Sequence, residues 1–338
     1  MKKRRALIAG AGHWSRAWGR ELQNCDRVEI AGWVDIRPGA AEDAVQQLGL
    51  QNVHTDTNLD RAIAIAKPDF AVNATVPSAH CDVSIQALEA GLPVVSEKPM
   101  AESMEQARAM VATSERTGNL LMINQQRRHD AGLVATRRLV EKHIGPLGIL
   151  TSDFCLGWHE SPFMLGMANP LLLDMAIHTF DAARFLSRAD PVAVYCDGFN
   201  PSWSWFSGDA SAVAIFEMTG GLRYIYQGSW CSQGLDTAWE AQWRAVGPQG
   251  TVIWDGQTAP EGEIVAEPGV FPATKSRIAA ELESDMPTWL AGSLRDFLHA
   301  LDTGATPMTE CHDNIKSLSM VLGALESAAT GRRVAIEL

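Results

Sequence analysis

The sequence has no uncharged run of about 18 apolar residues, the length that a helix needs to cross a bilayer. We also expect no export signal, because glycines and His13 interrupt the apolar stretch that follows the basic residues Lys2 to Arg5. Its six cysteines are widely scattered, without the paired spacing typical of zinc or redox sites. We therefore expect a cytoplasmic protein with reduced thiols, no bound metal and no membrane partner.

Positive charge is scarce as well, since 28 Lys and Arg stand against 40 Asp and Glu and give a net charge of -12. A chain this acidic lacks the basic surface that nucleic acid requires, so we expect no nucleic-acid partner. Internal repeats and low-complexity tracts are also missing. The 338 residues, of which 46% are hydrophobic, are sufficient for two globular domains.

The first motif is a glycine loop that follows an apolar strand at Arg4 to Ala9. The loop reads Gly10-Ala11-Gly12-His13-Trp14-Ser15 and leads into a helical run. Gly10 permits a tight turn, and Gly12 permits the backbone to approach a pyrophosphate at the helix N-terminus. Ser15 replaces the third glycine of the usual fingerprint. The loop predicts a dinucleotide site, with an ordinary strand-to-helix turn as the alternative.

An acid follows the second strand, as the fingerprint requires. The strand Val28 to Val34 ends at Asp35, about 20 residues beyond the glycines. A carboxylate there binds the adenosine ribose and repels a 2′-phosphate, which favours NAD. Arg37 lies two residues on and can hold that phosphate, so NADP remains an alternative.

Helical and apolar runs alternate up to residue 124, which predicts a doubly wound parallel sheet. The strand Phe70 to Ala74 runs into a loop with Ala74, Thr75 and Pro77, which can line the nicotinamide ribose, and then into His80. The alternative is an ordinary loop with His80 near a helix start. Farther on, Ser103 and Gln106 form a capping box for a helix from Met104 to Thr117.

The strand Leu92 to Val95 leads into Ser96-Glu97-Lys98-Pro99, around which we expect the chain to be organised. Ligands of open α/β sheets lie beyond the carboxyl ends of the strands, so Lys98 directs its amine into the crevice. Pro99 biases Lys98 toward an extended backbone. A surface Glu-Lys pair before a turn is the alternative.

We place the domain boundary after residue 124, so that residues 1–124 form the dinucleotide domain and residues 125–338 the second. Gln126 and Arg127 follow the boundary, and Arg127 and Arg128 either reach the crevice or are solvated at a helix start. The later strands follow one another without helices, which predicts a mostly antiparallel sheet. Its free face is expected to form a homodimer or homotetramer. The stretch Thr258 to Thr274 is expected to be a loop.

Two polar residues interrupt an apolar helical run at residues 170–181. Asp174 and His178 are four residues apart and therefore share one helix face. They are either a hydrogen-bonded structural pair or a catalytic pair with His178 as general base. A metal site lacks further ligands nearby. The second half is also rich in tryptophan, and Trp158 and His159 are the substrate contacts that we expect among residues that mostly belong to the sheet.

Together, the glycine loop, Asp35, Asn73 to Pro77, Glu97-Lys98-Pro99 and Asp174-x-x-x-His178 resemble the family of glucose–fructose oxidoreductase, inositol dehydrogenase and MocA-like proteins. The resemblance covers nearly the whole chain and implies a Rossmann domain, then an α+β domain with an open sheet. It implies NAD(P)-dependent oxidation of a sugar or polyol, often with a cis bond before Pro99. Ser15 and the pair Met175-Ala176 depart from the family pattern.

The resemblance also implies roles for individual residues. The expected catalytic residues are Lys98, Asp174 and His178. The expected cofactor contacts are Gly10, Gly12, His13, Trp14, Ser15, Asp35, Arg37, Ala74, Thr75, Pro77, His80, Glu97, Lys98 and Gln126. The expected substrate contacts are Lys98, Arg127, Trp158, His159, Asp174 and His178. Two other hypotheses remain: an NAD-dependent glycoside hydrolase of the same family, and a non-catalytic sensor that binds a dinucleotide.

Overall fold

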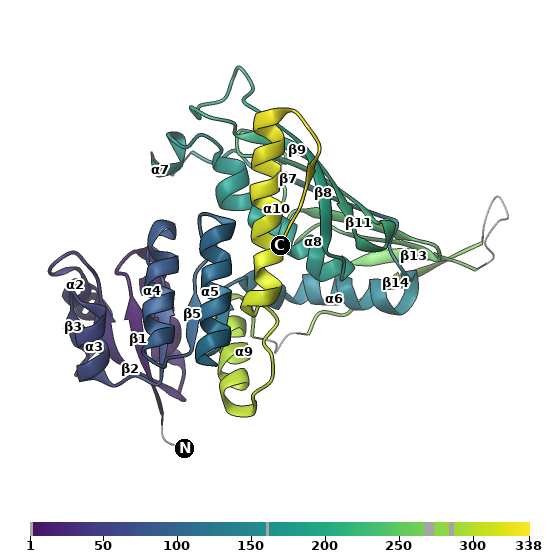
Figure 1. Cartoon of the computed structure of the whole chain (residues 1–338). Coiled ribbons are helices and arrows are strands. Elements are labelled where there is room, and N and C mark those ends of the chain that lie inside the picture. Colours follow the sequence, from purple (N-terminus) through teal and green to yellow (C-terminus); the bar gives the residue numbers. More distant parts are fainter. Residues whose placement is uncertain (1–2, 160–161, 267–273, 284–286) are drawn as a thin grey trace. The chain divides into compact units, whose positions relative to one another are not determined.

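The computed structural model describes residues 3–159, 162–266, 274–283 and 287–338. The chain forms two compact units, each described here by itself (Figure 1). The first unit comprises Met1–Gln126 and Trp289–Ile315, and the second comprises Arg127–Thr288 and Lys316–Leu338. Among the described residues, no helix combines the length and the apolar character needed to cross a bilayer. All six cysteines are free thiols.

The first unit is built on a parallel sheet of six strands in the order β3-β2-β1-β4-β5-β6, as the sequence predicted. The strands are β1 (Arg4–Ala9), β2 (Val28–Val34), β3 (His54–Asp56), β4 (Phe70–Asn73), β5 (Val94–Ser96) and β6 (Leu121–Ile123). The helices are α1 (His13–Asn24), α2 (Ala40–Gln47), α3 (Leu59–Ala66), α4 (Pro77–Glu89), α5 (Met104–Thr117) and α9 (Trp289–Thr303). The strand order reverses between β1 and β4, which places the switch point at their carboxyl ends.

Both faces of this sheet are buried, because alternate residues of β1 pack into apolar clusters on opposite faces. Ala6 and Ile8 pack into a cluster with residues of α1, α2 and α9, whereas Leu7 packs on the other face against α3. The capping box predicted for α5 is confirmed in part. The hydroxyl of Ser103 accepts a hydrogen bond from the Gln106 N–H at 3.2 Å, whereas the Gln106 side chain accepts from the N–H of Glu102 at 3.0 Å and not from that of Ser103. Continuous apolar strands and well-marked helix ends thus explain why the sequence pattern was sufficient here.

Helix α9 belongs to the first unit, although the sequence analysis placed all residues after 124 in the second domain. Its buried residues include Leu294, Phe297 and Leu298, and these join the same cluster as β1 and α1. The rings of Phe70 and Phe297 meet edge to face, with centroids 5.4 Å apart. The apolar face of α9 is therefore buried against a sheet that lies more than 160 residues earlier in the chain, which local patterns do not reveal.

The second unit contains a mixed, mostly antiparallel sheet of nine strands in the order β14-β13-β12-β11-β7-β10-β9-β8-β15. The strands are β7 (Ile149–Cys155), β8 (Pro191–Phe199), β9 (Ser211–Met218), β10 (Arg223–Ser229), β11 (Gln242–Gly247), β12 (Gly250–Trp254), β13 (Glu261–Val265), β14 (Lys275–Ala279) and β15 (Val334–Ala335). The loop expected at Thr258 to Thr274 is partly wrong, because β13 lies within it and pairs with β12. Residues 267–273 of that stretch lie outside the described part of the chain.

Helices cover one face of this sheet. The remaining helical segments are η1 (Gln126–His129), α6 (Ala131–Leu139), η2 (Val140–Ile144), α7 (Pro162–Leu165), η3 (Leu171–Ala176), α8 (Ile177–Ser187), η4 (Thr219–Gly221) and α10 (Cys311–Thr330). Gln126 and the start of α10, up to Ile315, belong to the first unit. Residues of α6, η3, α8 and the later turns of α10 pack with the inward side chains of the sheet in one apolar cluster. The strands alternate buried and exposed residues, so the opposite sheet face is free within this unit.

The helical run around Asp174 differs from the single α-helix that its spacing suggested. Leu171–Ala176 forms the π-helix η3, and α8 begins at Ile177. A π-helix adds a residue to the turn and changes the direction of the side chains on either side of it, and such turns are frequent at functional sites.

Candidate active site

The glycine loop connects β1 to α1, and its two glycines have different surroundings. Gly10 has a φ of +96°, and a Cβ there would lie 2.5 Å from the carbonyl oxygen of Ala74. Gly12 lies before α1, and no atom lies within 4 Å of the position its Cβ would occupy. The loop therefore leaves open space beside Gly12 at the start of α1, and the first N–H groups of a helix can bind a phosphate.

Ser15 occupies the position of the third glycine and makes two hydrogen bonds. Its buried hydroxyl donates to the carbonyl oxygen of Ala74 at 2.9 Å and accepts from the Gly12 N–H at 3.1 Å. The serine thus ties the loop to the end of β4 rather than obstructing it. His13 and Trp14 are exposed on the first turn of α1, with their rings edge to face.

Asp35 ends β2 as a buried carboxylate with several donors. Its oxygens accept from the Ala11 N–H at 2.7 Å, the Arg37 N–H at 2.9 Å and the Arg37 guanidinium at 2.9 and 3.1 Å. Burial opposes ionisation, but the hydrogen bonds from Arg37 and Ala11 outweigh it and lower the pKa of Asp35. The aspartate is thus anionic beside the glycine loop, and it holds Arg37.

The ends of β4 and β5 are joined through Asn73 and His80. Asn73 donates to the His80 carbonyl at 3.0 Å and accepts from the Thr75 hydroxyl at 2.7 Å. The ring of His80 contacts the carbonyl oxygens of Pro99, 2.7 Å from Nδ1, and of Thr75, 3.2 Å from Nε2. His80 is therefore a buried brace between the two loops, and Pro77 begins α4 behind them.

Glu97 and Pro99 hold Lys98 between fixed neighbours. The Lys98-Pro99 bond is cis, which confirms the expectation from the family resemblance. The Glu97 carboxylate is buried and accepts from Trp18 Nε1 and Asn124 Nδ2, both at 2.7 Å. Burial raises the pKa of Glu97, and these hydrogen bonds oppose the shift. The Glu97 carboxylate therefore binds groups inside the first unit. Because Glu97 is held in this way, the backbone of the next residue, Lys98, is positioned as well.

Gln126, at the end of the first unit, is buried with a side-chain oxygen that has no hydrogen-bond partner among the described residues. A buried amide without a partner is uncommon in folded proteins. This atom is therefore available to a ligand.

Arg127 and Arg128, in the second unit, are both buried, so the alternative of a solvated helix start is wrong. Arg127 donates to the carbonyl oxygen of Trp239 and to Met175 Sδ, 3.3 Å away. Burial lowers its pKa to about 10, although the nearby carboxylates of Glu240 and Asp174 oppose the shift. Arg127 and Asp174, both predicted to contact substrate, are thus brought into one charged cluster.

Arg128 instead forms a buried ion pair with Asp181 of α8. The guanidinium meets both carboxylate oxygens, at 2.6 and 2.8 Å, and the Ser317 hydroxyl donates to the carboxylate at 2.6 Å. This bidentate pair fixes η1 against α8. Since α8 carries His178 in its first turn, the pair positions that histidine.

His178 is 8% exposed, and Asp174 precedes it on η3 with intermediate exposure. The π-helical turn that contains Asp174 joins directly to the α-helix that contains His178. Lys98, the third residue predicted to be catalytic, belongs to the first unit.

The predicted substrate contacts Trp158 and His159 lie in an aromatic group. Trp158 contacts Trp239 edge to face, with centroids 5.2 Å apart, and its carbonyl accepts from Trp205 Nε1 at 2.8 Å. The ring of His159 stacks on Trp205 at 3.7 Å. The backbone carbonyl of Trp239 also accepts a hydrogen bond from Arg127. The aromatic group therefore lies next to the charged cluster that contains Arg127. Flat rings beside polar groups suit the CH faces and hydroxyls of a carbohydrate.

Glu240 is a residue that the sequence analysis missed. Burial raises its pKa, Arg127 opposes the shift, and its Oε1 has no hydrogen-bond partner among the described residues. The sole local hint in the sequence is an acid beside Trp239. Its relation to Arg127 spans more than 100 residues of chain.

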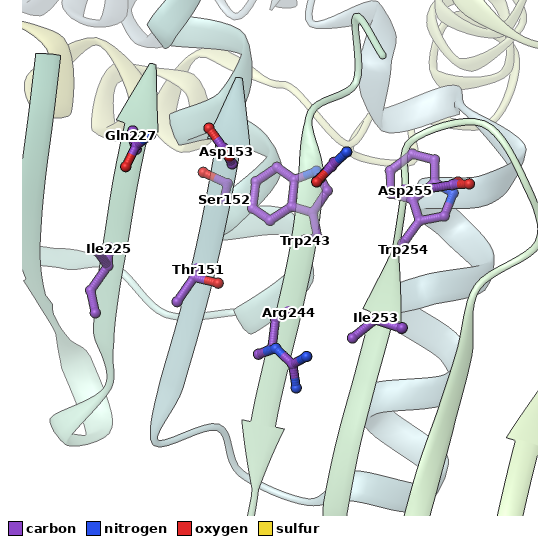
Figure 2. Close-up of a pocket in the computed structure, with 11 residues that line it drawn as sticks. Thr151, Ser152, Asp153, Ile225, Gln227, Trp243, Arg244, Ile253, Trp254 and Asp255 are labelled. Atoms are coloured by element: carbon purple, nitrogen blue, oxygen red, sulfur yellow. The ribbon is translucent and has the colours of Figure 1, made fainter. Parts of the chain in front are cut away.

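A depression of about 500 Å³ lies elsewhere, on the free face of the nine-stranded sheet. Figure 2 shows its side chains rising from neighbouring strands, among them Thr151, Ile225, Arg244 and Ile253. None of the predicted catalytic or cofactor residues lines it. The depression is therefore a feature of the sheet face and not part of the candidate active site.

Comparison with known proteins identifies both halves of the chain. Residues 4–125 match the model of an oxidoreductase family with an NAD-binding Rossmann fold, and residues 133–253 match the GFO/IDH/MocA C-terminal domain.

Two similar relatives span nearly the whole chain. A D-apiose dehydrogenase of Paraburkholderia graminis is 24% identical over 100% of this chain and 91% of its own length. An inositol 2-dehydrogenase of Rhizobium meliloti is 24% identical over 97% of this chain and 98% of its own length. Among solved structures, an oxidoreductase from Agrobacterium radiobacter in complex with NAD+, L-tartaric acid and magnesium superposes with a TM-score of 0.86 at 22% identity, over 99% of both chains. This likeness establishes the fold.

Proposed function

Since the chain belongs to the GFO/IDH/MocA oxidoreductase family, with its NAD-binding Rossmann fold, we propose that it transfers a hydride between NAD and a hydroxyl-bearing carbon of a sugar, inositol or related polyol. The observation that carries the proposal is the position of Lys98. It follows a buried strand at the sheet's carboxyl edge, between a Glu97 side chain and a Pro99 carbonyl that are both held by hydrogen bonds. Such an edge is where ligands of this fold bind.

The residues of the first unit fit NAD. The pyrophosphate suits the open space at Gly12 before α1, and the adenosine ribose suits the carboxylate of Asp35. Arg37 is paired with Asp35. A 2′-phosphate would therefore be repelled by the Asp35 carboxylate, and the Arg37 guanidinium would already be engaged. This arrangement supports NAD over NADP. The other proposed contacts are His13, Trp14, Ala74, Thr75, Pro77, His80 and Gln126, and Ser15 and Glu97 support the loops from within.

Three side chains carry the proposed chemistry. The bound nicotinamide supplies the hydride acceptor. His178 acts as general base and accepts the proton of the substrate hydroxyl. Lys98 donates a hydrogen bond to the same oxygen and stabilises the negative charge that develops there. Asp174 accepts a hydrogen bond from a neighbouring substrate hydroxyl or orients His178.

The second unit supplies the proposed substrate contacts. The guanidinium of Arg127 is fixed by Trp239 and Met175 and interacts electrostatically with Asp174 and Glu240. The group of Trp158, His159 and Trp205 offers flat apolar surfaces beside it. A polyhydroxylated substrate satisfies both kinds of surface, because its hydroxyls pair with polar groups and its CH faces pack on rings.

The test is absorbance at the NADH band when the purified protein meets NAD or NADP with inositols, aldoses, sugar acids and sugar alcohols. We expect a rise with NAD and at least one polyol, and Lys98→Met should abolish it without loss of NAD binding. A flat trace with every substrate would contradict the proposal. Glycoside hydrolysis without net NADH release would then identify the hydrolase alternative, and NAD binding without any turnover would identify a sensor.

We also propose that the free face of the nine-stranded sheet joins copies of this chain into a homodimer or homotetramer. Paired residues on neighbouring strands place an exposed row across it, and the row consists of Tyr195, Ile215, Ile225, Thr151, Arg244 and Ile253. The four large apolar members are each at least 37% exposed. Large apolar side chains gathered on one exposed sheet face are typical of interfaces.

A further inference from the structure

Three consecutive residues present three different metal-binding atoms where α10 begins. Glu310 Oε1 lies 2.8 Å from Cys311 Sγ and 2.8 Å from His312 Nδ1, and Sγ lies 3.6 Å from Nδ1. The three atoms therefore form a small triangle of oxygen, sulfur and nitrogen. All three residues belong to the first unit, and none is among the predicted cofactor or substrate contacts.

The orientation of this triangle is fixed from two sides. The second carboxylate oxygen of Glu310 accepts from the His312 N–H at 2.9 Å, and the Glu310 carbonyl accepts from the Asn314 N–H at 2.9 Å. Oε1 is thereby held toward the thiol and the ring. On the far side of the ring, Nε2 lies 2.9 Å from a carboxylate oxygen of Glu115 on α5.

The Glu115 contact has a direct chemical consequence. A neutral imidazole that donates from Nε2 to Glu115 turns the lone pair of Nδ1 toward the Glu310 carboxylate, so that both atoms can bind one cation. A histidine whose outer nitrogen donates to a carboxylate is also the usual form of a metal ligand.

We propose that Glu310, Cys311 and His312 bind one divalent transition-metal ion, with Glu115 as the outer carboxylate and water in the fourth position. A point just outside the plane of the triangle lies about 2 Å from all three atoms, close to the bond lengths of zinc with oxygen, nitrogen and sulfur. Zn²⁺ is the best match, because it accepts this mixed set of donors in tetrahedral geometry. His312 is exposed, so the ion can enter from solvent.

The experiment uses the full-length protein, freed of metal and titrated with Zn²⁺ in competition with a chromophoric chelator. We expect one equivalent of Zn²⁺ per chain. Cys311→Ser and His312→Asn should each weaken binding by at least about 100-fold, and Glu115→Gln by about 10-fold, as is typical of an outer partner. Co²⁺ in place of Zn²⁺ should give a thiolate charge-transfer band that Cys311→Ser abolishes.

Matched controls come from the same unit. Cys25→Ser removes a partly buried thiol and His299→Asn an exposed imidazole, and neither should change the affinity. His312→Asn alters an exposed side chain, so it tests the site even where substitution of the buried Cys311 prevents folding. The proposal would be overturned if Zn²⁺ did not bind stoichiometrically, or if binding survived both Cys311→Ser and His312→Asn. The three residues would then be only a hydrogen-bonded start of α10.

Discussion

Arg37 holds the carboxylate of Asp35 from two nitrogens, with Nε 2.9 Å from Oδ1 and Nη2 3.1 Å from Oδ2. The same carboxylate receives the Ala11 N–H of the glycine loop at 2.7 Å. One aspartate therefore determines both the charge that a cofactor ribose would meet and the position of the cation that could instead bind a phosphate.

Asp35→Ser should change the cofactor preference. The variant loses an acceptor for the ribose hydroxyls and releases Arg37 toward a 2′-phosphate. We expect kcat/KM for NAD to fall by about 10- to 100-fold, the value of a charged hydrogen bond, while kcat/KM for NADP rises. Steady-state kinetics with both cofactors measure the ratio. The double variant Asp35→Ser/Arg37→Ala is the control and should lose the gain with NADP; an unchanged ratio in Asp35→Ser would contradict this role.

His178→Asn should slow turnover by about 10²- to 10⁴-fold, the usual contribution of a general base. NAD binding, followed by quenching of tryptophan fluorescence, should remain as in the parent protein, because His178 lies in the second unit and the predicted NAD loop in the first. Single-turnover kinetics separate the two effects. If His178→Asn retained normal turnover, the assignment of this residue as the base would be wrong.

The buried pair Arg128–Asp181 should be important for stability. Asp181→Asn leaves a buried guanidinium without its counter-charge, which costs about 3–5 kcal/mol of unfolding free energy. The exposed pair Arg116–Glu89 is a matched control, and Glu89→Gln should cost less than about 1 kcal/mol. Urea unfolding followed by tryptophan fluorescence compares the variants. Equal effects at the two pairs would refute the structural role of Asp181.

His80 should make stability depend on pH. Burial lowers its pKa, so the unfolded chain binds a proton more readily than the folded one. The free energy of unfolding then rises with pH, and this contribution is lost as pH falls below about 6.5, the ordinary pKa of histidine. His80→Gln should reduce stability at pH 7.5 and lose less on acidification to pH 5 than the parent protein does.

Urea titrations at several pH values measure this difference. The exposed His299 provides the control, and His299→Gln should follow the parent curve. Parallel pH profiles for the parent protein and His80→Gln would show that His80 is not the linked group.

Ile215→Asp should disrupt the proposed assembly through the sheet face. Ile215 is paired with Tyr195 on β8 and with Ile225 on β10, so it lies within the exposed row. A charge buried at an interface without a partner weakens association. Size-exclusion chromatography with light scattering should show a smaller species than the parent assembly. Ile65→Asp, at an exposed position on α3, should leave the size unchanged; a monomeric parent protein would contradict the proposal itself.

Much of the first unit could be predicted from the sequence because its determinants are local. Gly10, Asp35 and Lys98 each lie at the end of an apolar strand, and in a parallel sheet all such ends reach the same edge. Ser103 and Gly118 mark the ends of α5 through the chemistry of helix caps. The family resemblance rested on these same short stretches.

The second unit was less predictable because its polar residues find partners far along the chain. Arg127 and Arg128 resemble a solvated helix start, yet one is enclosed near Trp239 and Glu240 and the other pairs with Asp181. A spacing of four predicts an α-helical face for Asp174, whereas this segment forms a π-helix.

The sequence alone thus determined the parallel sheet, the glycine loop with its acid, and the identities of Lys98, Asp174 and His178 as candidates. Only the tertiary structure decided that α9 completes the first unit, that Arg128 is a structural ion pair and that Glu240 joins Arg127. The physical reason is that backbone patterns depend on neighbours within a few residues, whereas burial of a charge depends on which distant groups surround it.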